Sequence, residues 1–519
     1  MASASENNTE AAITLALETI NIQKQAIVFA NTRLSAEKTA EEMAKKIKQS
    51  DQENLAELEY EVLHALSTST KQCKRLAFCI KKGIAFHHAG LAPAQRSLIE
   101  DSFRKGDIKV ICCTPTLAYG LDLPAFRVVI RDLKRFTYRG MQYIPVLEYL
   151  QMSGRAGRPK YDNYGESIAI ANTEKIRDEI RKTYIKGKPE TIYSKLAAEP
   201  VLRTYILSLI ASEFVGTKDQ LFNFFSKTFW AHHYQDMWQL QKIIDKMMDL
   251  LEEWEFIKTD KKDFMSADED YKINTTKLGK RVAELYIDPL TANFFITCLR
   301  NASSKKPEDF SYFQMISNTL ELRPLLRVKR KDVDFVESVL LRHEDALLED
   351  TDVYESEYND EYSTFMVSIK TALFFKDWVN EKDEEFLLEK FDIRPGEIAS
   401  KLERGNWLLY TATELSKLLG FKGLITDLIN LRLRLKYGAK GELLPLLKFK
   451  NIGRVRARKL FNNTIKDVSG VKKADFMKLS QLLGNNTAVN IKKQVGQDFT
   501  KLKVKKGRRK GQMSLKKYS

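Results

Sequence analysis

The chain has 519 residues, of which 43% are hydrophobic, so we expect a folded protein with several domains rather than one core. Its net charge of +16 favours a polyanionic partner such as nucleic acid, although much of that charge lies in the acid-free tail 501–519. Five cysteines without CxxC spacing and the lack of a long apolar run predict a soluble, reduced, cytoplasmic protein with no metal, no disulfide and no membrane partner.

The first 175 residues alternate short apolar runs with helical patterns. A tail and a helix over 11–20 fill residues 1–24, and further helices are expected at 36–48, capped by Ser35, at 50–67 and at 93–103. The runs that indicate strands are 25–30, 83–90, 108–113, 127–130 and 167–170. This alternation predicts a parallel α/β domain over 25–175, with ligands at the carboxyl ends of its strands.

The remainder of the chain is mostly helical. Helices at 202–212, 218–226 and 237–253, followed by a hairpin of 254–258 with 271–274, predict a winged helix over 176–288. Residues 289–440 indicate a helical bundle, 441–495 a domain of short helices, and 496–519 a basic tail. The fold class is therefore multi-domain, α/β plus α.

Two segments of the α/β domain suit phosphate binding. Gln151-Met-Ser-Gly-Arg-Ala-Gly-Arg158 places Arg155 and Arg158 three residues apart, so that both guanidinium groups project to one side if they lie on a helix. Thr114 to Pro124 follows the third strand and offers hydroxyls and backbone N–H groups. Each segment alone fits a bland interpretation equally well, a basic surface turn or a plain loop.

The order of four segments is more specific: Ile27 to Arg33, Phe86 to Gly90, Thr114 to Pro124, and Gln151 to Pro159. This series resembles the second RecA-like domain of superfamily-two helicases. It is most similar to the archaeal Hjm-type DNA repair helicases, relatives of the Ski-type RNA helicases. The resemblance covers nearly the whole chain, because the winged-helix, helical and C-terminal regions follow the same order.

The resemblance implies two sets of site residues in this domain. Arg155 and Arg158 would be arginine fingers, with Arg158 the first candidate, and the nucleotide-binding set would comprise Gln151, Gly120 and Asp122. Asp122 stands where the family usually has asparagine, and its charge repels phosphate. A second set would contact the DNA strand: Asn31, Arg33, His88, Gly90, Thr114 and Thr116.

The resemblance also implies a strand-separating hairpin and a helix along the translocating strand. Phe136, Tyr138 and Tyr143 lie in the segment 131–148, and aromatic rings can stack on the last base pair, although a simple sheet extension is the alternative. Trp407 would stack on a base. A core tryptophan is the alternative, since the basic partner expected seven residues earlier is Ser400 here, with Lys401 or Arg404 as substitutes.

The C-terminal region contains two further candidate sites. Ile452-Gly453 predicts the turn of a helix-hairpin-helix that binds the DNA backbone, with charge added by Arg454, Arg456 and Arg458. In the tail, Gln512, Leu515 and Tyr518 resemble the peptide that docks on the sliding clamp PCNA, although its second aromatic residue is missing.

The sequence contains no GxxxxGK[ST] motif and no DExH box after an apolar strand. We therefore expect the C-terminal portion of an ATP-dependent 3′–5′ DNA helicase that acts on forked or stalled replication intermediates. It would share ATP and Mg²⁺ with a P-loop/DExH half, supplied as a separate subunit or a missing segment, and would be inactive without it. Two alternatives remain, half of a Ski-type RNA helicase and a non-catalytic nucleic-acid-binding module; the Ile452-Gly453 turn favours DNA.

Overall fold

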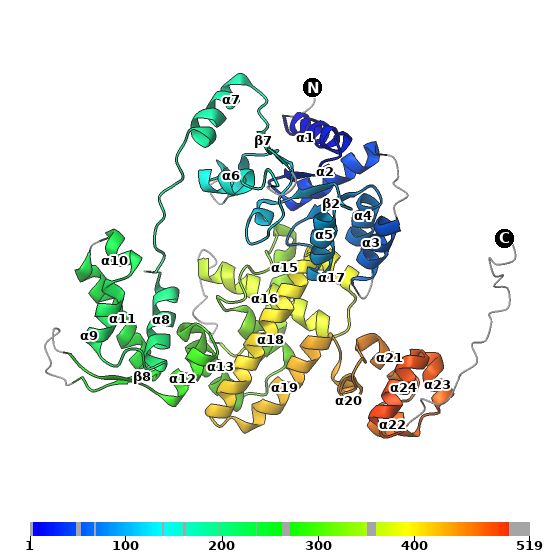
Figure 1. The fold of residues 1–519 in the computed structure, drawn as a ribbon. Helices are drawn as coiled ribbons and strands as arrows, with labels where there is room; N and C mark the ends of the chain where they lie inside the picture. The colour runs from blue at the N-terminus through cyan, green and yellow to red at the C-terminus, as the bar shows by residue number, and fades with distance from the viewer. Residues whose placement is uncertain are drawn as a thin grey trace. The chain divides into compact units, whose positions relative to one another are not determined.

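The computed structural model describes residues 4–47, 53–66, 69–137, 140–158, 162–196, 198–234, 236–261, 270–349 and 360–497. The chain forms two compact units (Figure 1). The first comprises Met1–Lys195, Thr228–Gln235 and Glu384–Lys401, and the second comprises Leu196–Lys227, Asp236–Asp383 and Leu402–Ser519. Helix α18, Pro395–Leu418, begins in the first unit and ends in the second.

A five-stranded parallel sheet in the order β2-β3-β1-β4-β7 forms the core of the first unit. The strands are β1 (Ala26–Phe29), β2 (Ile84–His87), β3 (Val110–Cys113), β4 (Arg127–Ile130) and β7 (Glu166–Ala169). In β1, β2 and β3 every residue is buried, as expected for a parallel sheet that is covered on both faces. The five strands predicted from the sequence are confirmed: β4 lies at its predicted residues, β7 begins one residue earlier than predicted, and β1, β2 and β3 are each shorter than predicted.

Helices before and between the strands cover this sheet (Figure 1). The helices of the first unit are α1 (Ala4–Asn21), α2 (Arg33–Lys46), α3 (Glu53–His64), α4 (Lys71–Ile80), α5 (Pro93–Lys105), α6 (Val146–Ser153), α7 (Glu174–Ile180) with a π-helical turn at Arg181–Ile185, α10 (Phe229–Tyr234) and α17 (Glu384–Phe391). A 3₁₀ turn, Pro115–Ala118, follows β3. The antiparallel hairpin β5 (Lys134–Thr137) and β6 (Gly140–Tyr143) follows β4.

Three local predictions were wrong. Helix α1 is longer than expected and belongs to the sheet's core through Ala12, Ile13 and Ala16, so the sheet domain does not begin at residue 25. The side chain that caps α2 is Thr32, which accepts a hydrogen bond from the N–H of Ser35. Helix α6 ends at Ser153, before both arginines of its motif.

The second unit begins with the elements expected between residues 199 and 275. Helices α8 (Glu199–Ala211), α9 (Lys218–Ser226) and α11 (Met237–Glu253) precede the antiparallel pair β8 (Ile257–Thr259) and β9 (Ile273–Thr275). Helix α12, Lys277–Glu284, follows and packs on α8. The helices and the hairpin lie close to the predicted ranges; their assignment as a winged helix stays a prediction.

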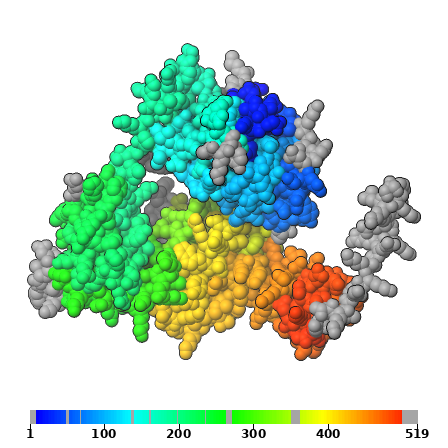
Figure 2. Space-filling view, in the orientation of Figure 1, coloured from blue at the N-terminus to red at the C-terminus, as the bar shows by residue number. Residues whose placement is uncertain are grey.

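The remaining helices of the second unit form a bundle and a C-terminal group. The bundle, whose colours run from green through yellow in Figure 2, consists of α13 (Pro289–Ser304), α14 (Asp309–Ser317), α15 (Val333–His343), α16 (Asp360–Val379), the later part of α18, and α19 (Lys422–Tyr437). The C-terminal group has its own hydrophobic core and consists of α20 (Leu444–Leu447), α21 (Arg454–Asn462), α22 (Val468–Lys473), α23 (Phe476–Leu483) and α24 (Asn485–Gln494). Along the described ranges, none of the helices is both long and apolar enough to cross a bilayer.

The buried sheet makes a first testable prediction. Ile111 on β3 is fully buried, whereas Ile22 after α1 is 52% exposed. We expect Ile111→Ala to lower the stability of the sheet by about 2–5 kcal/mol, because the lost methyl groups leave a cavity. Native-state hydrogen exchange of the strand amides measures this, with Ile22→Ala as the matched control. Equal protection in the two variants would contradict a sheet that is buried on both faces.

Candidate nucleotide and nucleic-acid site

The predicted site residues of the first unit lie at two opposite edges of the sheet. Strand pairing places Phe29, His87 and Cys113 level with one another at the carboxyl edge. The segments that begin with Ala30, His88 and Thr114 therefore leave the sheet side by side. These segments contain the residues expected to contact a nucleic acid strand.

The two arginines of the Gln151–Arg158 motif lie at the amino edge instead. Ala125, two residues before β4, donates its N–H to the carbonyl of Arg155 and accepts a hydrogen bond from the N–H of Gly157. Arg158 donates to the side-chain oxygen of Gln25, just before β1, at 2.7 Å. Four residues of strand, roughly 13 Å, separate the two edges.

Arg158 is held by an internal carboxylate. Its Nε and one terminal nitrogen donate to the two oxygens of Asp162 at 2.7 and 3.2 Å, and Lys24 donates to the same carboxylate at 2.7 Å. The hydrogen bonds from Arg158 lower the pKa of Asp162 to about 2. Both oxygens of Asp162 are therefore engaged by cationic side chains of the same chain.

Arg155 makes a separate contact with its own chain. Its guanidinium donates to the carbonyl oxygen of Ala118 at 2.6 Å, in the 3₁₀ turn after β3. The two arginines therefore do not project from one helical face, because α6 has already ended at Ser153. Gln151 lies on α6 and is exposed.

The loop from Thr114 to Pro124 joins the two edges, because it leaves the carboxyl end of β3 and enters the amino end of β4. The hydroxyls of Thr114 and Thr116 lie 2.9 Å apart at its start. Gly120 adopts φ +74°, which favours glycine, and Asp122 is exposed. Thr116, Gly120 and Asp122 are all exposed at the surface.

Asn31 lies at the root of the hairpin. Its side chain donates to the carbonyl of Lys134 at 3.0 Å, and its backbone N–H donates to the carboxylate of Asp132 at 3.2 Å. Arg33, at the start of α2, pairs with Glu397 at the start of α18. Both side chains are partly exposed, so they remain able to contact a bound strand.

His88 is fully buried and does not present its ring to a ligand. Its Nε2 lies 2.9 Å from a carboxylate oxygen of Glu37, and its Nδ1 accepts the N–H of Gly90 at 3.1 Å. This pattern suits the neutral tautomer with the proton on Nε2, and burial lowers the pKa of His88. The prediction that this ring contacts DNA does not fit its position.

Glu37 is the acceptor around which this region is built. Glu37 is 1% exposed. Besides the contact with His88, its carboxylate forms ion pairs with Arg394 and with Arg75, the latter at 2.6 Å, and accepts a hydrogen bond from the side chain of Gln72 at 2.9 Å. Burial alone would raise its pKa, but the His88 hydrogen bond and the charge of Arg394 outweigh burial and lower the pKa to about 2. A buried carboxylate with several donors is stable only in its charged form.

Two glycines, Gly90 and Gly396, allow the loop after β2 to pack closely against the start of α18. Gly90 accepts the N–H of Gly396 at 3.1 Å, and a Cβ on Gly90 would stand 2.7 Å from the Cδ of Arg394. A Cβ on Gly396 would overlap the carbonyl oxygens of Ala89 and Leu91. Gly90 thus serves close packing rather than direct contact with a strand.

Glu37, Arg394 and Glu397 belong to none of the sequence motifs, although the fold brings them together at this site. One signal for Glu37 was available, because it lies three residues before Ala40 on the buried stripe of α2. A charged residue on an apolar stripe indicates a buried ion pair. Nothing local marked Arg394, whose partner is 357 residues away in the chain.

In the hairpin, the one aromatic residue whose side chain is described is Tyr143. Its hydroxyl donates to Glu179 at 2.8 Å, and Lys134 lies 4.3 Å from its ring centre. Burial and the hydrogen bond to Glu179 raise its pKa. Phe136 pairs through its backbone with Met141. The side chain of Phe136 and the whole of Tyr138 lie outside the described residues.

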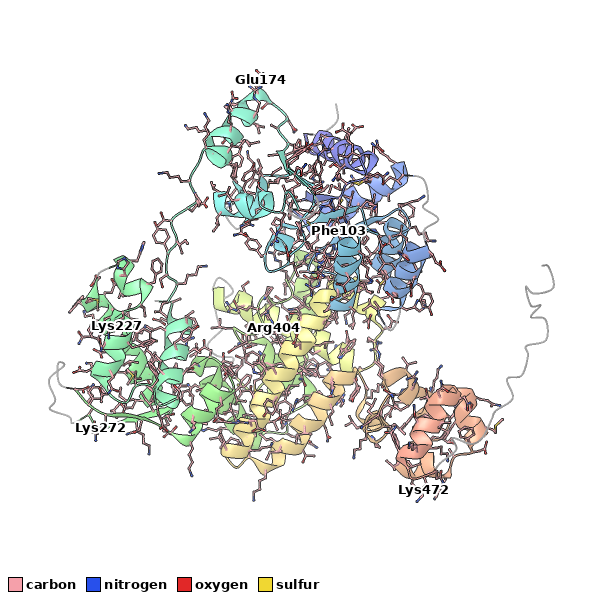
Figure 3. All side chains as sticks on the ribbon, in the orientation of Figure 1. Phe103, Glu174, Lys227, Lys272, Arg404 and Lys472 are labelled. Carbon is pink, nitrogen blue, oxygen red and sulfur yellow. The ribbon has the colours of Figure 1, made fainter. Side chains whose placement is uncertain are left out.

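Trp407 lies on the later part of α18, in the second unit. Its ring is partly buried, and its indole N–H donates to the carbonyl of Leu285 at 3.1 Å. Arg404, labelled in Figure 3, is exposed and donates to the carbonyls of Glu321 and Arg323. Arg404 lies three residues before Trp407 on α18, about one helical turn away.

The three arginines of α21 differ in their environments. Arg456 is exposed and donates to a nearby backbone oxygen, that of Asn451, at 2.7 Å. Arg454 lies over the ring of Trp378 at 4.8 Å. Arg458 is held by two carboxylates, Glu381 at 2.6 and 2.8 Å and Glu442 at 2.6 Å, and the Glu381 hydrogen bond raises its pKa.

The remaining predictions concern metal binding, the cysteines and the clamp-binding peptide. Within the described part of the chain, no group of three or more His, Cys, Asp or Glu residues could hold a metal ion, and the five cysteines are free and buried. The predicted clamp-binding residues Gln512, Leu515 and Tyr518 lie outside the described residues.

Comparison with known proteins supports the motif assignment. Residues 8–160 match the model of the helicase conserved C-terminal domain, and residues 310–438 match archaeal helicase domain 4. The ATP-dependent DNA helicase Hel308 of Pyrococcus abyssi is 39% identical over 501 residues, covering 96% of this chain and 67% of that protein. The Hel308 of Methanococcus vannielii is 36% identical, covering 93% and 67%, and that of Methanocella arvoryzae is 39% identical, covering 93% and 64%.

We expect the Glu37 cluster to make the stability of the first unit depend on pH. The pKa of Glu37 is lowered from 4.5 to about 2 in the fold. Its contribution to stability is therefore present above pH 4.5 and lost as the pH falls toward 2; a shift of this size corresponds to about 3 kcal/mol. We expect Glu37→Gln to lower the melting temperature relative to the wild type, most strongly at neutral pH. The difference between the two melting temperatures should become smaller as the pH falls.

Calorimetric melting at a series of pH values measures this gap. Glu57, an exposed glutamate on α3, provides the matched control Glu57→Gln, which should melt like the wild type throughout. A gap between wild type and Glu37→Gln that is constant with pH would show that Glu37 carries no such linkage.

Proposed function

Because the chain belongs to the Hel308 family of DNA helicases, we propose that it forms the part of such an enzyme that holds the DNA strand and supplies arginines to ATP. The observation that carries this proposal is the placement of the two motif sets on opposite edges of one RecA-like sheet. The loop 114–124 joins those edges, and Arg155 is fastened to it at Ala118. A change at the nucleotide can therefore reach the strand through a short, continuous path.

The arginine pair fits a nucleotide phosphate. Arg158 already binds an oxyanion through two nitrogens, namely the carboxylate of Asp162, and phosphate has the same acceptor geometry. ATP with Mg²⁺ supplies the free energy of phosphoryl transfer. Arg155 and Arg158 would stabilise charge on the phosphates, and Gln151 and Gly120 would contact the nucleotide. The P-loop and DExH residues would come from a separate half or segment.

The DNA strand would run along the carboxyl edge of the sheet. Asn31, Arg33, Thr114 and Thr116 can reach it directly, whereas His88 and Gly90 would act by holding their loop in place. Exposed Asp122 would lie beside the nucleotide, where its charge disfavours close approach of phosphate.

The remaining regions would act on a fork, with translocation from 3′ to 5′. The hairpin, with Phe136, Tyr138 and Tyr143, would separate the duplex, and Trp407 would stack on the unwound strand. The helices around Ile452-Gly453 would bind the DNA backbone as a helix-hairpin-helix, and 176–288 would form a winged helix. We extend the proposal to the tail, where Gln512, Leu515 and Tyr518 would dock on a sliding clamp.

Removal of the arginine finger tests the nucleotide half of the proposal. In a complex with a P-loop/DExH half, we expect Arg158→Ala to lower kcat of the DNA-stimulated ATPase about 10³-fold, since an arginine finger stabilises transition-state charge. Steady-state ATPase assays measure this. Arg177→Ala, which removes an exposed arginine of α7 paired with Glu174 and Asp178, is the matched control and should not change kcat. An unchanged rate for Arg158→Ala would overturn the assignment.

The α21 arginines test the DNA half. Arg456 is free to exchange its backbone contact for a phosphate, whereas Arg458 would first have to leave two carboxylates. We expect Arg456→Ala to weaken DNA binding and to reduce the slope of log K against log salt by about 1. Arg458→Ala should lower thermal stability and leave that slope unchanged. The reverse pattern, measured by fluorescence anisotropy at several salt concentrations, would contradict this division.

A further inference from the structure

An ion pair joins the hairpin to the helix that precedes the arginines. One terminal nitrogen of Arg135, on β5, donates to both carboxylate oxygens of Glu148, on α6, at 2.9 and 2.8 Å. The carboxylate of Glu148 is nearly buried, with 7% of its side chain exposed, while 43% of the Arg135 side chain is exposed. A carboxylate this buried is costly without its cation, so the pair is a strong constraint on both elements.

Helix α6 spans the sheet from one edge to the other. It begins three residues after β6, on the side of the carboxyl edge, and the residues that follow it reach Ala125 at the amino edge. Its eight residues extend about 12 Å, close to the length of the strands. A helix of this length moves as a rod, so displacement of its first turn is passed to its last.

The spacing along α6 directs that displacement to the nucleotide residues. Glu148 and Gln151 lie three residues apart on α6, and Arg155 lies two residues past the end of the helix. Rotation of α6 about its own axis would therefore move Glu148 and Gln151 in the same direction. Arg155 would follow through the short turn that contains Gly154.

The 3₁₀ turn after β3 packs against α6, the helix that contains Glu148. Burial and the charge of Glu148 raise the pKa of Tyr119, and the charge of Arg135 opposes that increase, which places Tyr119 within electrostatic range of both. Tyr119 follows Ala118, the residue whose carbonyl accepts the guanidinium of Arg155. The hairpin, α6 and the loop that joins the two edges thus converge on Arg135 and Glu148.

We propose that Arg135 and Glu148 are positioning residues that couple strand separation at the hairpin to the ATP-facing residues at the end of α6. This inference rests on the proposed function, because it requires that the hairpin contacts the fork and that Gln151 and Arg155 face ATP. Neither residue touches DNA or nucleotide in this role. Their pairing keeps the hairpin root and the first turn of α6 in one orientation.

The decisive quantity is the number of base pairs unwound per ATP hydrolysed by the chain in complex with a P-loop/DExH half on forked DNA. We expect Arg135→Ala to lower that ratio about tenfold, within the range typical of coupling between two sites, while DNA-stimulated ATPase stays within about twofold. Arg135→Lys, which keeps the cation, should recover most of the ratio. Arg177→Ala, the control on α7, should leave both activities at the wild-type level.

A second measurement uses the chain alone. Forked DNA should slow hydrogen exchange at the α6 amides of the wild type, and Arg135→Ala should abolish that effect while still binding the fork. If Arg135→Ala lowers ATPase and unwinding in equal proportion, or leaves the ratio and the exchange unchanged, the coupling role is overturned. If the wild type itself neither binds nor unwinds forks, the proposed function has failed instead.

Discussion

The parallel pairing of five short strands decides where every candidate group of the first unit lies. Because Phe29, His87, Cys113 and Ile130 are level, the segments that follow them emerge together at one edge. The same register places Gln25 and Ala125 at the opposite edge, where they receive Arg158 and the backbone of Gly157. The separation of the two candidate sites is therefore a property of strand length, and only segments that cross the sheet can connect them.

Several arginines of the first unit are paired with carboxylates of the same unit. Arg158 is paired with Asp162, Arg33 with Glu397, Arg135 with Glu148, and Arg394 with Glu37. Binding of a phosphate at Arg158 would exchange one oxyanion for another, so its net free energy is smaller than the strength of either contact suggests. Glu37 differs from the others because it is buried among several donors and has no comparable substitute.

Local elements were predicted well where the sequence pattern is strong. The ranges of α9 and α11 match the sequence prediction, and β4 was placed at its observed residues, because amphipathic spacing and short β-branched runs are local signals. Helix α1 is longer than predicted, because its polar first turn has no apolar stripe that would indicate a helix. The sequence predicted that Arg155 and Arg158 lie on a helix, but α6 ends at Ser153, before both residues.

The sequence by itself determined the family, the sheet domain, and the two arginines and hydroxyl residues that suit phosphates. Those features depend on residue type and spacing within a few positions. Only the tertiary structure decided which of these residues are available to a ligand. His88 is buried and hydrogen-bonded to Glu37, and Arg458 is paired with two carboxylates. Arg135 forms an ion pair with Glu148 on α6. Each outcome depends on partners from other segments of the chain, and no local pattern encodes such contacts.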